Sequence, residues 1–170
     1  MKLLLLLAPV ALLLAQTRTP PIENEFVRVV FAADRPVAQA GPLHEHKNNR
    51  VMIYLDSGDI QIKYADGKVE NQHWKTGDVA WSPANGMHTS QNISAQPVRI
   101  IEIELKNAGT DKAEQTTRPN FIMDNRQVRV YRGTEAPKTG HYLAADVKAG
   151  TAFWDKMPEG AGPFVITEIK

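Results

Sequence analysis

Hydrophobic and polar residues alternate with a period of two over much of the chain. Residues 59–64 place Ile60, Ile62 and Tyr64 on one face and polar residues on the other, which is typical of a half-buried strand. Residues 50–55 are almost continuously apolar and suit a strand buried on both faces. Further strands are predicted over residues 25–31, 79–82, 88–93 and 98–105. Short strands at this spacing predict an all-β sandwich or barrel.

Turn residues separate these strands. Residues 65–68, Ala-Asp-Gly-Lys, predict a tight hairpin because Asp and Gly both tolerate positive φ. Residues 83–86 and 94–97 mark two further turns. Only residues 107–117 have a helical composition, and they lack a sustained apolar face, so they predict a linker or one short helix.

The end of the chain weakly repeats its beginning. Residues 124–130 match residues 23–29 at four of seven positions, and residues 163–169 match residues 97–103 equally well. The matched blocks are 67 residues apart in the first copy and 32 in the second, so the second copy lacks its middle. Chance similarity between β-rich segments is the alternative. We therefore expect a barrel domain at 17–106, a linker at 107–118 and a partial, degenerate repeat at 119–170 that packs on the barrel.

The first residues have the layout of a secretory signal. Lys2 is followed by an apolar run of 13 residues, interrupted only by Pro9, that ends at the small residue Ala15. A membrane-spanning helix needs about 20 apolar residues, so we expect a signal peptide over residues 1–16 that is cleaved. An uncleaved anchor is the alternative. The mature protein is then expected to be exported, periplasmic or extracellular, without a stable membrane span.

The composition excludes several classes of function. Without the leader, 19 basic residues balance 19 acidic ones, and there is no run of like charges. A nucleic-acid partner is therefore not expected. The chain contains no cysteine, so disulfides and thiolate nucleophiles are excluded and any metal must be held by His and carboxylates. About 154 mature residues suit a single core.

Two short segments carry candidate chemistry. In residues 41–46, Gly-Pro-Leu-His-Glu-His, one residue separates His44 from His46, so on an extended strand both project from the same face. Glu45 points to the opposite face and is not counted as a ligand. The second segment, residues 77–92, contains His88.

Together these segments resemble the two sequence motifs of the cupin family. The positions that match the second motif are Gly77, Pro83, His88 and Asn92. Asn85 stands where the family has Gly, and Asn is the non-glycine residue that best tolerates a left-handed turn. The resemblance covers residues 25–106. It implies a small antiparallel β-barrel, or double-sheet jelly roll, with a divalent metal ion bound by His44, His46 and His88.

The first motif departs from the family at a ligand position. Three or four residues after His46, where the family has a metal-binding Glu, this chain has Arg50 or Val51. One of the two, but not both, is expected to face the cavity, and an inward Arg50 would repel the ion. Three neutral imidazoles without a carboxylate favour Zn, Fe, Ni or Cu over hard cations. The alternative is a barrel that has lost its metal and retains hydrogen-bonded histidines.

Other residues complete the expected site. Those predicted to line the cavity or to support the ligands are Arg50, Val51, Asn92, Tyr54 and Trp81. Glu102 and Glu104 could replace the missing carboxylate if their strand face lined the cavity, but solvated outer positions are favoured. His73 and His141 lie outside both motifs and are expected to be ordinary exposed or partly buried residues.

The expected function is that of an exported protein with a three-His metal site that binds or acts on a small molecule. Whether it is an enzyme stays open, because no acid or base is placed near the three histidines. The alternative is a metal-free barrel that binds a small molecule or serves assembly. A homodimer is possible through open sheet edges.

Overall fold

The structure is a computed structural model that describes residues 22–37, 39–110 and 120–170. Every regular element in these ranges is a β-strand, which confirms the all-β prediction. In the same ranges no helix is long and apolar enough to cross a membrane. The predicted leader at residues 1–16 and residues 111–118 of the predicted linker lie outside them.

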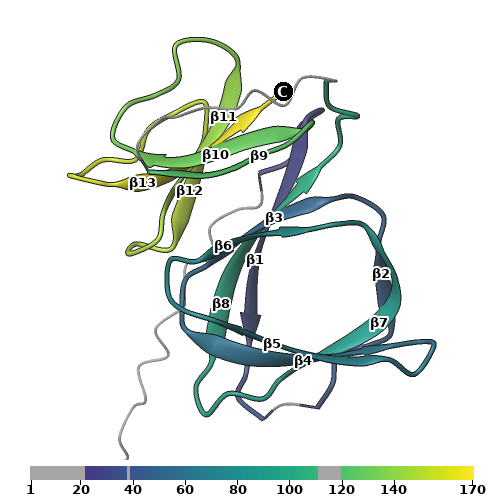
Figure 1. Cartoon of the computed structure of the whole chain (residues 1–170). Coiled ribbons are helices and arrows are strands. Elements are labelled where there is room, and N and C mark those ends of the chain that lie inside the picture. The colour runs from purple at the N-terminus through teal and green to yellow at the C-terminus, as the bar shows by residue number, and fades with distance from the viewer. Residues whose placement is uncertain (1–21, 38, 111–119) are drawn as a thin grey trace, which may run out of the picture.

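Eight strands form a barrel of two four-stranded antiparallel sheets (Figure 1). Sheet A has the order β1-β8-β3-β6 and consists of β1 (Val27–Asp34), β8 (Val98–Leu105), β3 (Arg50–Tyr54) and β6 (Val79–Ser82). Sheet B has the order β2-β7-β4-β5 and consists of β2 (His44–His46), β7 (Asn85–Asn92), β4 (Gly58–Tyr64) and β5 (Val69–Trp74). The chain crosses repeatedly between the two sheets, as in a double-sheet jelly roll. The predicted fold class is confirmed.

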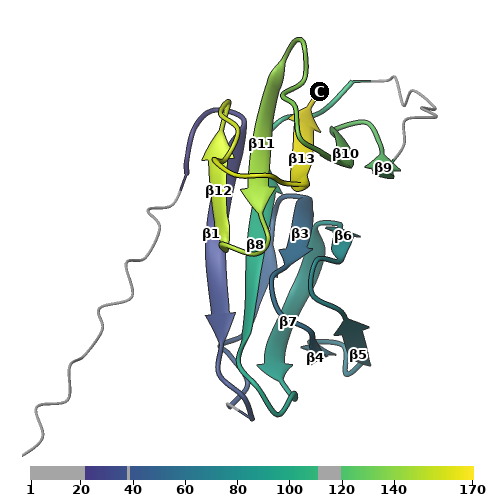
Figure 2. The same ribbon diagram turned by 90° about the vertical axis from the view of Figure 1, so that its left-hand side faces the viewer.

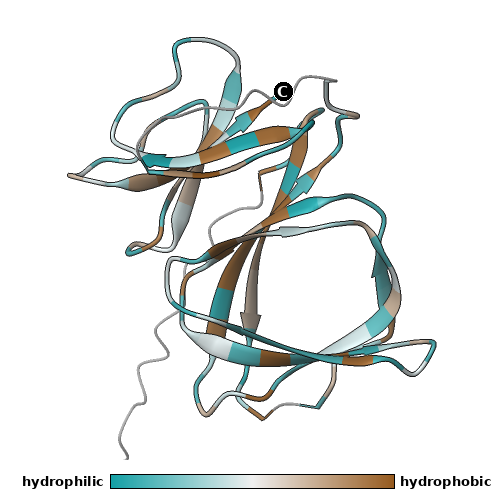
Figure 3. Ribbon diagram, in the orientation of Figure 1, coloured by the Kyte–Doolittle hydropathy of each residue, from teal (hydrophilic) through white to brown (hydrophobic). Residues whose placement is uncertain are grey.

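A third sheet follows the barrel. Sheet C has the order β12-β11-β13-β10-β9 and consists of β9 (Phe121–Asp124), β10 (Val128–Gly133), β11 (His141–Asp146), β12 (Thr151–Trp154) and β13 (Phe164–Ile169). It lies against the outer face of sheet A (Figure 2). Hydrophobic stretches on β3, β8 and β10 mark where the two sheets face each other (Figure 3). The buried side chains between them include Val27, Val29, Ile101, Ile103, Val128, Val130, Leu143 and Val165.

Strand β3 contributes to two cores at once. Val51 and Ile53 are fully buried between sheets A and C, whereas Met52 and Tyr54 belong to a separate cluster inside the barrel. All five residues of this strand are buried. The prediction of a strand buried on both faces is therefore confirmed.

Two residues that the weak repeat aligns form the same turn. The Asn24 side-chain oxygen accepts hydrogen bonds from the backbone N–H groups two and three residues later, and Asn125 does the same. In both copies the following strand, β1 or β10, pairs antiparallel with the last strand of its copy, β8 or β13. The repeat itself stays a prediction, which this shared turn supports.

The turns differ from expectation in one place. The hairpin at residues 65–68 is confirmed, with Gly67 at a φ of 91°. Strand β7, however, starts at Asn85 rather than residue 88. Asn85 pairs with His46 in the sheet and is not among the residues with positive φ. The turn predicted over residues 83–86 therefore ends earlier than expected, because strand pairing continues through Asn85.

Ile103 and Ile93 provide a matched test of the packing between sheets A and C. Ile103 is fully buried there, whereas Ile93 is 42% exposed. Ile103→Ala is expected to lower the free energy of unfolding by about 2–5 kcal/mol because it leaves a cavity. Ile93→Ala is expected to change it by less than about 0.5 kcal/mol. Urea denaturation measures both, and equal losses would contradict a shared core.

Candidate metal centre

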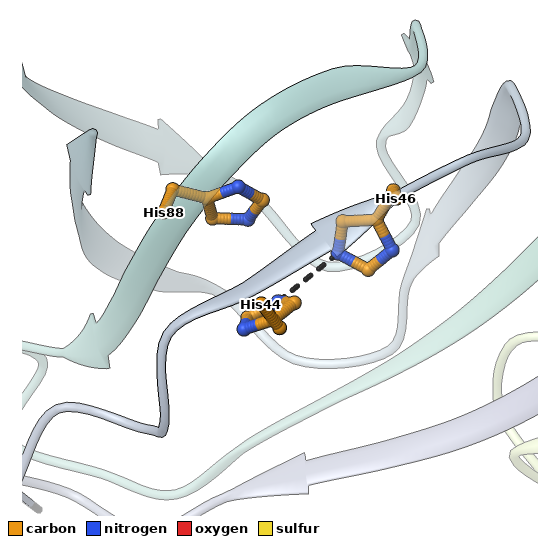
Figure 4. Close-up of side chains that lie close together, drawn as sticks. All are labelled: His44, His46 and His88. Carbon is orange, nitrogen blue, oxygen red and sulfur yellow. Dashed lines mark hydrogen bonds between the residues drawn. The ribbon is translucent and has the colours of Figure 1, made fainter. Parts of the chain in front are cut away.

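The three histidines of the two motifs lie together in the barrel (Figure 4). His44 and His46 come from β2, and His44 pairs in register with His88 on β7. A register irregularity interrupts the pairing between His44 and His46. The ring centroids are 4.5–5.3 Å apart, and one nitrogen from each ring lies within 4.8 Å of the others. The three side chains are thus close enough to hold one metal ion.

Backbone carbonyls fix the tautomers of two of these rings. His44 Nδ1 lies 2.9 Å from the carbonyl oxygen of Pro42, and His88 Nδ1 lies 2.8 Å from that of Gly86. A carbonyl oxygen only accepts, so in each ring Nδ1 carries the proton that is donated, and the neutral form of the ring then has its lone pair on Nε2. Metal-binding histidines are commonly oriented by such a contact from their second nitrogen.

The surroundings of His46 keep this ring neutral. Its Nε2 lies 2.8 Å from Arg50 Nη1, and because a guanidinium only donates, Nε2 is the acceptor. Burial, together with the nearby charge of Arg50 and of the two other histidines, lowers the pKa of His46 to about 4. At neutral pH this ring therefore keeps a lone pair on Nε2.

The two Nε2 atoms of β2 face each other. His44 Nε2 and His46 Nε2 are 3.2 Å apart, within hydrogen-bond distance (Figure 4), so either a proton or a metal ion can lie between them. Two nitrogen ligands of one tetrahedral zinc ion lie about 3.3 Å apart, given Zn–N bonds of about 2.0–2.1 Å. The spacing of this pair therefore fits a metal ion, and the third ring is close enough to complete the group.

Of Arg50 and Val51, between which the sequence could not decide, Arg50 is the residue that faces the cavity. Its Nη1 also donates to Glu102 Oε2 at 2.9 Å, its Nη2 donates to Ser82 Oγ at 2.8 Å, and its side chain is only 7% exposed. The lone pair of His46 Nε2 can either accept the hydrogen bond from Arg50 or coordinate a metal ion, but not both. Metal binding therefore requires the guanidinium to release His46, while Glu102 and Ser82 can continue to hold it.

Glu102 is one of the residues whose predicted position is wrong. Its side chain is 17% exposed and lines the cavity, so the solvated outer position favoured for it is wrong. The alternation of β8 turns Ile101 and Ile103 outward into the core with sheet C and hence Glu102 inward. Burial raises the pKa of Glu102, and the charge of Arg50 partly offsets this effect. Glu102 is ion-paired with Arg50 and, among the described residues, is not part of the three-residue group that could hold a metal.

Two predicted cavity residues lie elsewhere. Val51 is fully buried between sheets A and C, because it alternates with Arg50 along β3. Asn92 is 1% exposed, and its amide donates to the backbone oxygens of Asp34 and Gln96. It stabilises the loop after β7 and does not line the cavity. Placing Val51 and Asn92 at the cavity is therefore corrected.

Tyr54 and Trp81 do line the cavity. Trp81 also packs on the core between sheets A and C. His73 and His141 lie outside the three-His group. Each pairs through Nδ1 with an aspartate 2.7 Å away, and their side chains are 67% and 49% exposed.

The cavity beside the histidines has a volume of about 910 Å³, within the range of small-molecule sites. Two of its residues, Ile122 and Arg132, belong to sheet C. Nothing in the pattern of the sequence pointed to them, because their place depends on how sheet C meets the barrel.

No protein family matches the sequence, and no curated protein does. Solved structures match part of it. A cupin domain from Bordetella pertussis Tohama I is 23% identical with a TM-score of 0.47, over 52% of this chain and 93% of that one. An RmlC-like cupin family protein with a double-stranded β-helix fold from Methanocaldococcus jannaschii is 18% identical with a TM-score of 0.41, over 49% and 73%. A protein with a double-stranded β-helix domain from Klebsiella pneumoniae subsp. pneumoniae is 23% identical with a TM-score of 0.38, over 55% and 84%.

These likenesses extend over about half of this chain. By its own strand order the barrel is a double-sheet jelly roll, with the three histidines on β2 and β7. In this chain the barrel is followed by sheet C.

The lowered pKa of His46 predicts how the metal-free protein responds to acid. The unfolded chain binds a proton at this residue near its ordinary pKa of 6.5, whereas the folded protein does so only near pH 4. The unfolded state therefore binds more protons in this window, and the free energy of unfolding falls as the pH decreases through it. Urea denaturation at a series of pH values, with a chelator present to keep the protein metal-free, measures this decrease in the free energy of unfolding. His46→Asn is expected to make it shallower, and an unchanged slope would contradict the assignment.

Proposed function

We propose that the barrel binds one divalent transition-metal ion through Nε2 of His44, His46 and His88 and offers the remaining coordination positions to a small molecule. The observation that carries this proposal is the convergence of three ring nitrogens within 4.8 Å, two of them with tautomers fixed by backbone carbonyls. Neutral nitrogen donors without a carboxylate favour zinc, iron(II), nickel or copper. The signal layout of residues 1–16 leads us to place the protein outside the cytoplasm.

A metal ion held by three protein ligands supplies Lewis acidity at its open positions. The residues of the chain prepare the site for it: backbone carbonyls orient two rings, and burial keeps His46 neutral. Glu102 lines the cavity and is suited to accept or return a proton, because burial raises its pKa. A second carboxylate, Glu104, lies 4.0 Å from His46 Nδ1.

Arg50 supports a second candidate function. Its guanidinium already contacts His46 Nε2 and brings a positive charge to the place where the family has a ligand carboxylate. In this candidate the barrel binds its small molecule without a metal, and Arg50 takes the electrostatic role of the ion. Metal analysis separates the two candidates.

The first test is the metal content of the purified protein, prepared without a polyhistidine tag. The parent is expected to hold one ion per chain, and His44→Ala and His88→Ala are each expected to lose it because two nitrogens cannot fill the site. His73→Ala is the matched control, since His73 is exposed and outside the group. Elemental analysis gives the result. A parent without metal would favour the metal-free candidate.

The second test concerns the competition between Arg50 and the metal ion for His46. Arg50→Gln shortens the side chain and removes the charge, so His46 no longer has to give up its hydrogen bond to the guanidinium when the ion binds. Metal affinity is therefore expected to rise about tenfold to a hundredfold, which corresponds to the free energy of one hydrogen bond to a charged group. Arg99→Gln is the control, because Arg99 forms an exposed ion pair with Asp56. Competition titration with a chelating dye measures both. An unchanged affinity in Arg50→Gln would show that the guanidinium does not compete.

A further inference from the structure

The cavity has two chemically different ends. On β3 the residues that face it are Arg50, Met52 and Tyr54. Arg50 lies beside the histidines. Tyr54 is four residues further along the strand, so its Cα lies about 13 Å from that of Arg50 at a rise of about 3.3 Å per residue. Along this wall the lining changes from charged to apolar to aromatic.

The far end is lined by two buried aromatic rings, those of Tyr54 and Trp74. The rings of Tyr54 and Trp74 stack with their centroids 4.3 Å apart and an interplanar angle of 20°. The Trp74 indole N–H donates to the backbone oxygen of Asp56, so towards the cavity this residue offers ring surface only. Ile60 and Ile100 belong to the same cluster and also line the cavity. This end therefore suits an apolar, planar group.

Sheet C contributes to the wall at this end. Arg132 donates to the backbone oxygen of Gly77, and the Gly77 N–H donates to the backbone oxygen of Tyr54 at 2.7 Å. Arg132 and Ile122 both line the cavity. Sheet C thus helps to define the space beside Tyr54.

The charges of the lining favour an uncharged ligand. The Arg50 guanidinium is ion-paired with Glu102, and Arg132 donates to the backbone oxygen of Gly77. Glu70 is ion-paired with Lys68, and Asp78 accepts a hydrogen bond from the backbone N–H of Lys75. A charged ligand would therefore have to be buried beside charged groups that already have partners, which is unfavourable.

We propose that the ligand is an uncharged molecule with a planar aromatic body of one or two rings and a single nitrogen or oxygen donor atom. The donor occupies an open position of the metal ion, and the body extends past Met52 to Tyr54 and Trp74. The proposal rests on the metal site proposed above for its anchor. The aromatic end and the charges of the lining select the class of ligand.

Three probes test this class on metal-loaded protein at mildly alkaline pH: 4-phenylimidazole, imidazole and benzoate. Imidazole has the donor without the body, and benzoate has the body with a charged donor. 4-Phenylimidazole is expected to bind about tenfold or more tightly than either, because burial of its ring adds apolar area. Isothermal titration calorimetry measures the three dissociation constants.

A cavity-filling variant locates the ring. Ala80 lines the cavity and pairs with Met52 between its two ends, so Ala80→Ile obstructs the passage. It is expected to abolish the advantage of 4-phenylimidazole over imidazole while metal content is retained. Ala33→Ile, at an exposed position of β1, is the control and is expected to retain the advantage.

The outcomes separate the two proposals. Bound metal with equal affinities for 4-phenylimidazole and imidazole overturns the aromatic ligand and leaves the metal site standing. Tighter binding of benzoate than of 4-phenylimidazole overturns the uncharged ligand. An advantage that survives in Ala80→Ile overturns the placement of the ring. A parent that binds no metal overturns the metal site and, with it, the anchored ligand.

Discussion

Successive side chains of β3 point to opposite faces of sheet A, and both the packing and the site depend on this alternation. Val51 and Ile53 are held between sheets A and C, where neither is exposed. Their burial fixes the register of the strand, because a shift by one residue would turn Arg50 into an apolar core and Val51 into the cavity. The inward positions of Arg50, Met52 and Tyr54 follow from that packing. The apolar contact with sheet C therefore determines the chemistry of the cavity wall.

At the polar end of the cavity, contacts between buried charged and polar groups offset the cost of burying them. Arg50 links His46 to Glu102, and each of these contacts offsets part of the cost of burying the guanidinium. Its Nε has no hydrogen-bond partner among the described residues, so the compensation is incomplete. A metal ion at the histidines would replace one of these contacts and leave the ion pair with Glu102. The same arrangement thus explains how the barrel tolerates an arginine in this place and why that arginine opposes the ion.

Much of the barrel could be predicted from the sequence because period-two patterns report directly on burial. The strand at residues 79–82 and the buried strand beginning at Arg50 follow from such patterns. The grouping of the three histidines followed from the spacing of the two motifs. The direction of Arg50 could not be predicted, because β3 is buried on both faces and its pattern does not reveal which face lines the cavity. Glu102 was misplaced for a related reason, since a charged residue on a strand suggests solvent unless its ion-pair partner is known.

The residues that sheet C contributes to the cavity could not be predicted from the hydrophobic pattern either. Ile122 and Arg132 reach the cavity only because β9 and β10 lie at one side of sheet C, which is a property of tertiary packing. Asn85 was misjudged because strand pairing with His46 extends the β7 strand through a position that its residue type assigns to a turn. In both cases long-range contacts override a local preference.

Sheet C also bears on how copies of this chain can associate. A barrel whose outer sheet face is apolar could bury that face against a second barrel, but here the chain covers it with its own C-terminal strands. Association of two copies through the outer face of sheet A would therefore require sheet C to be displaced from it, at the cost of exposing the core that the two sheets share.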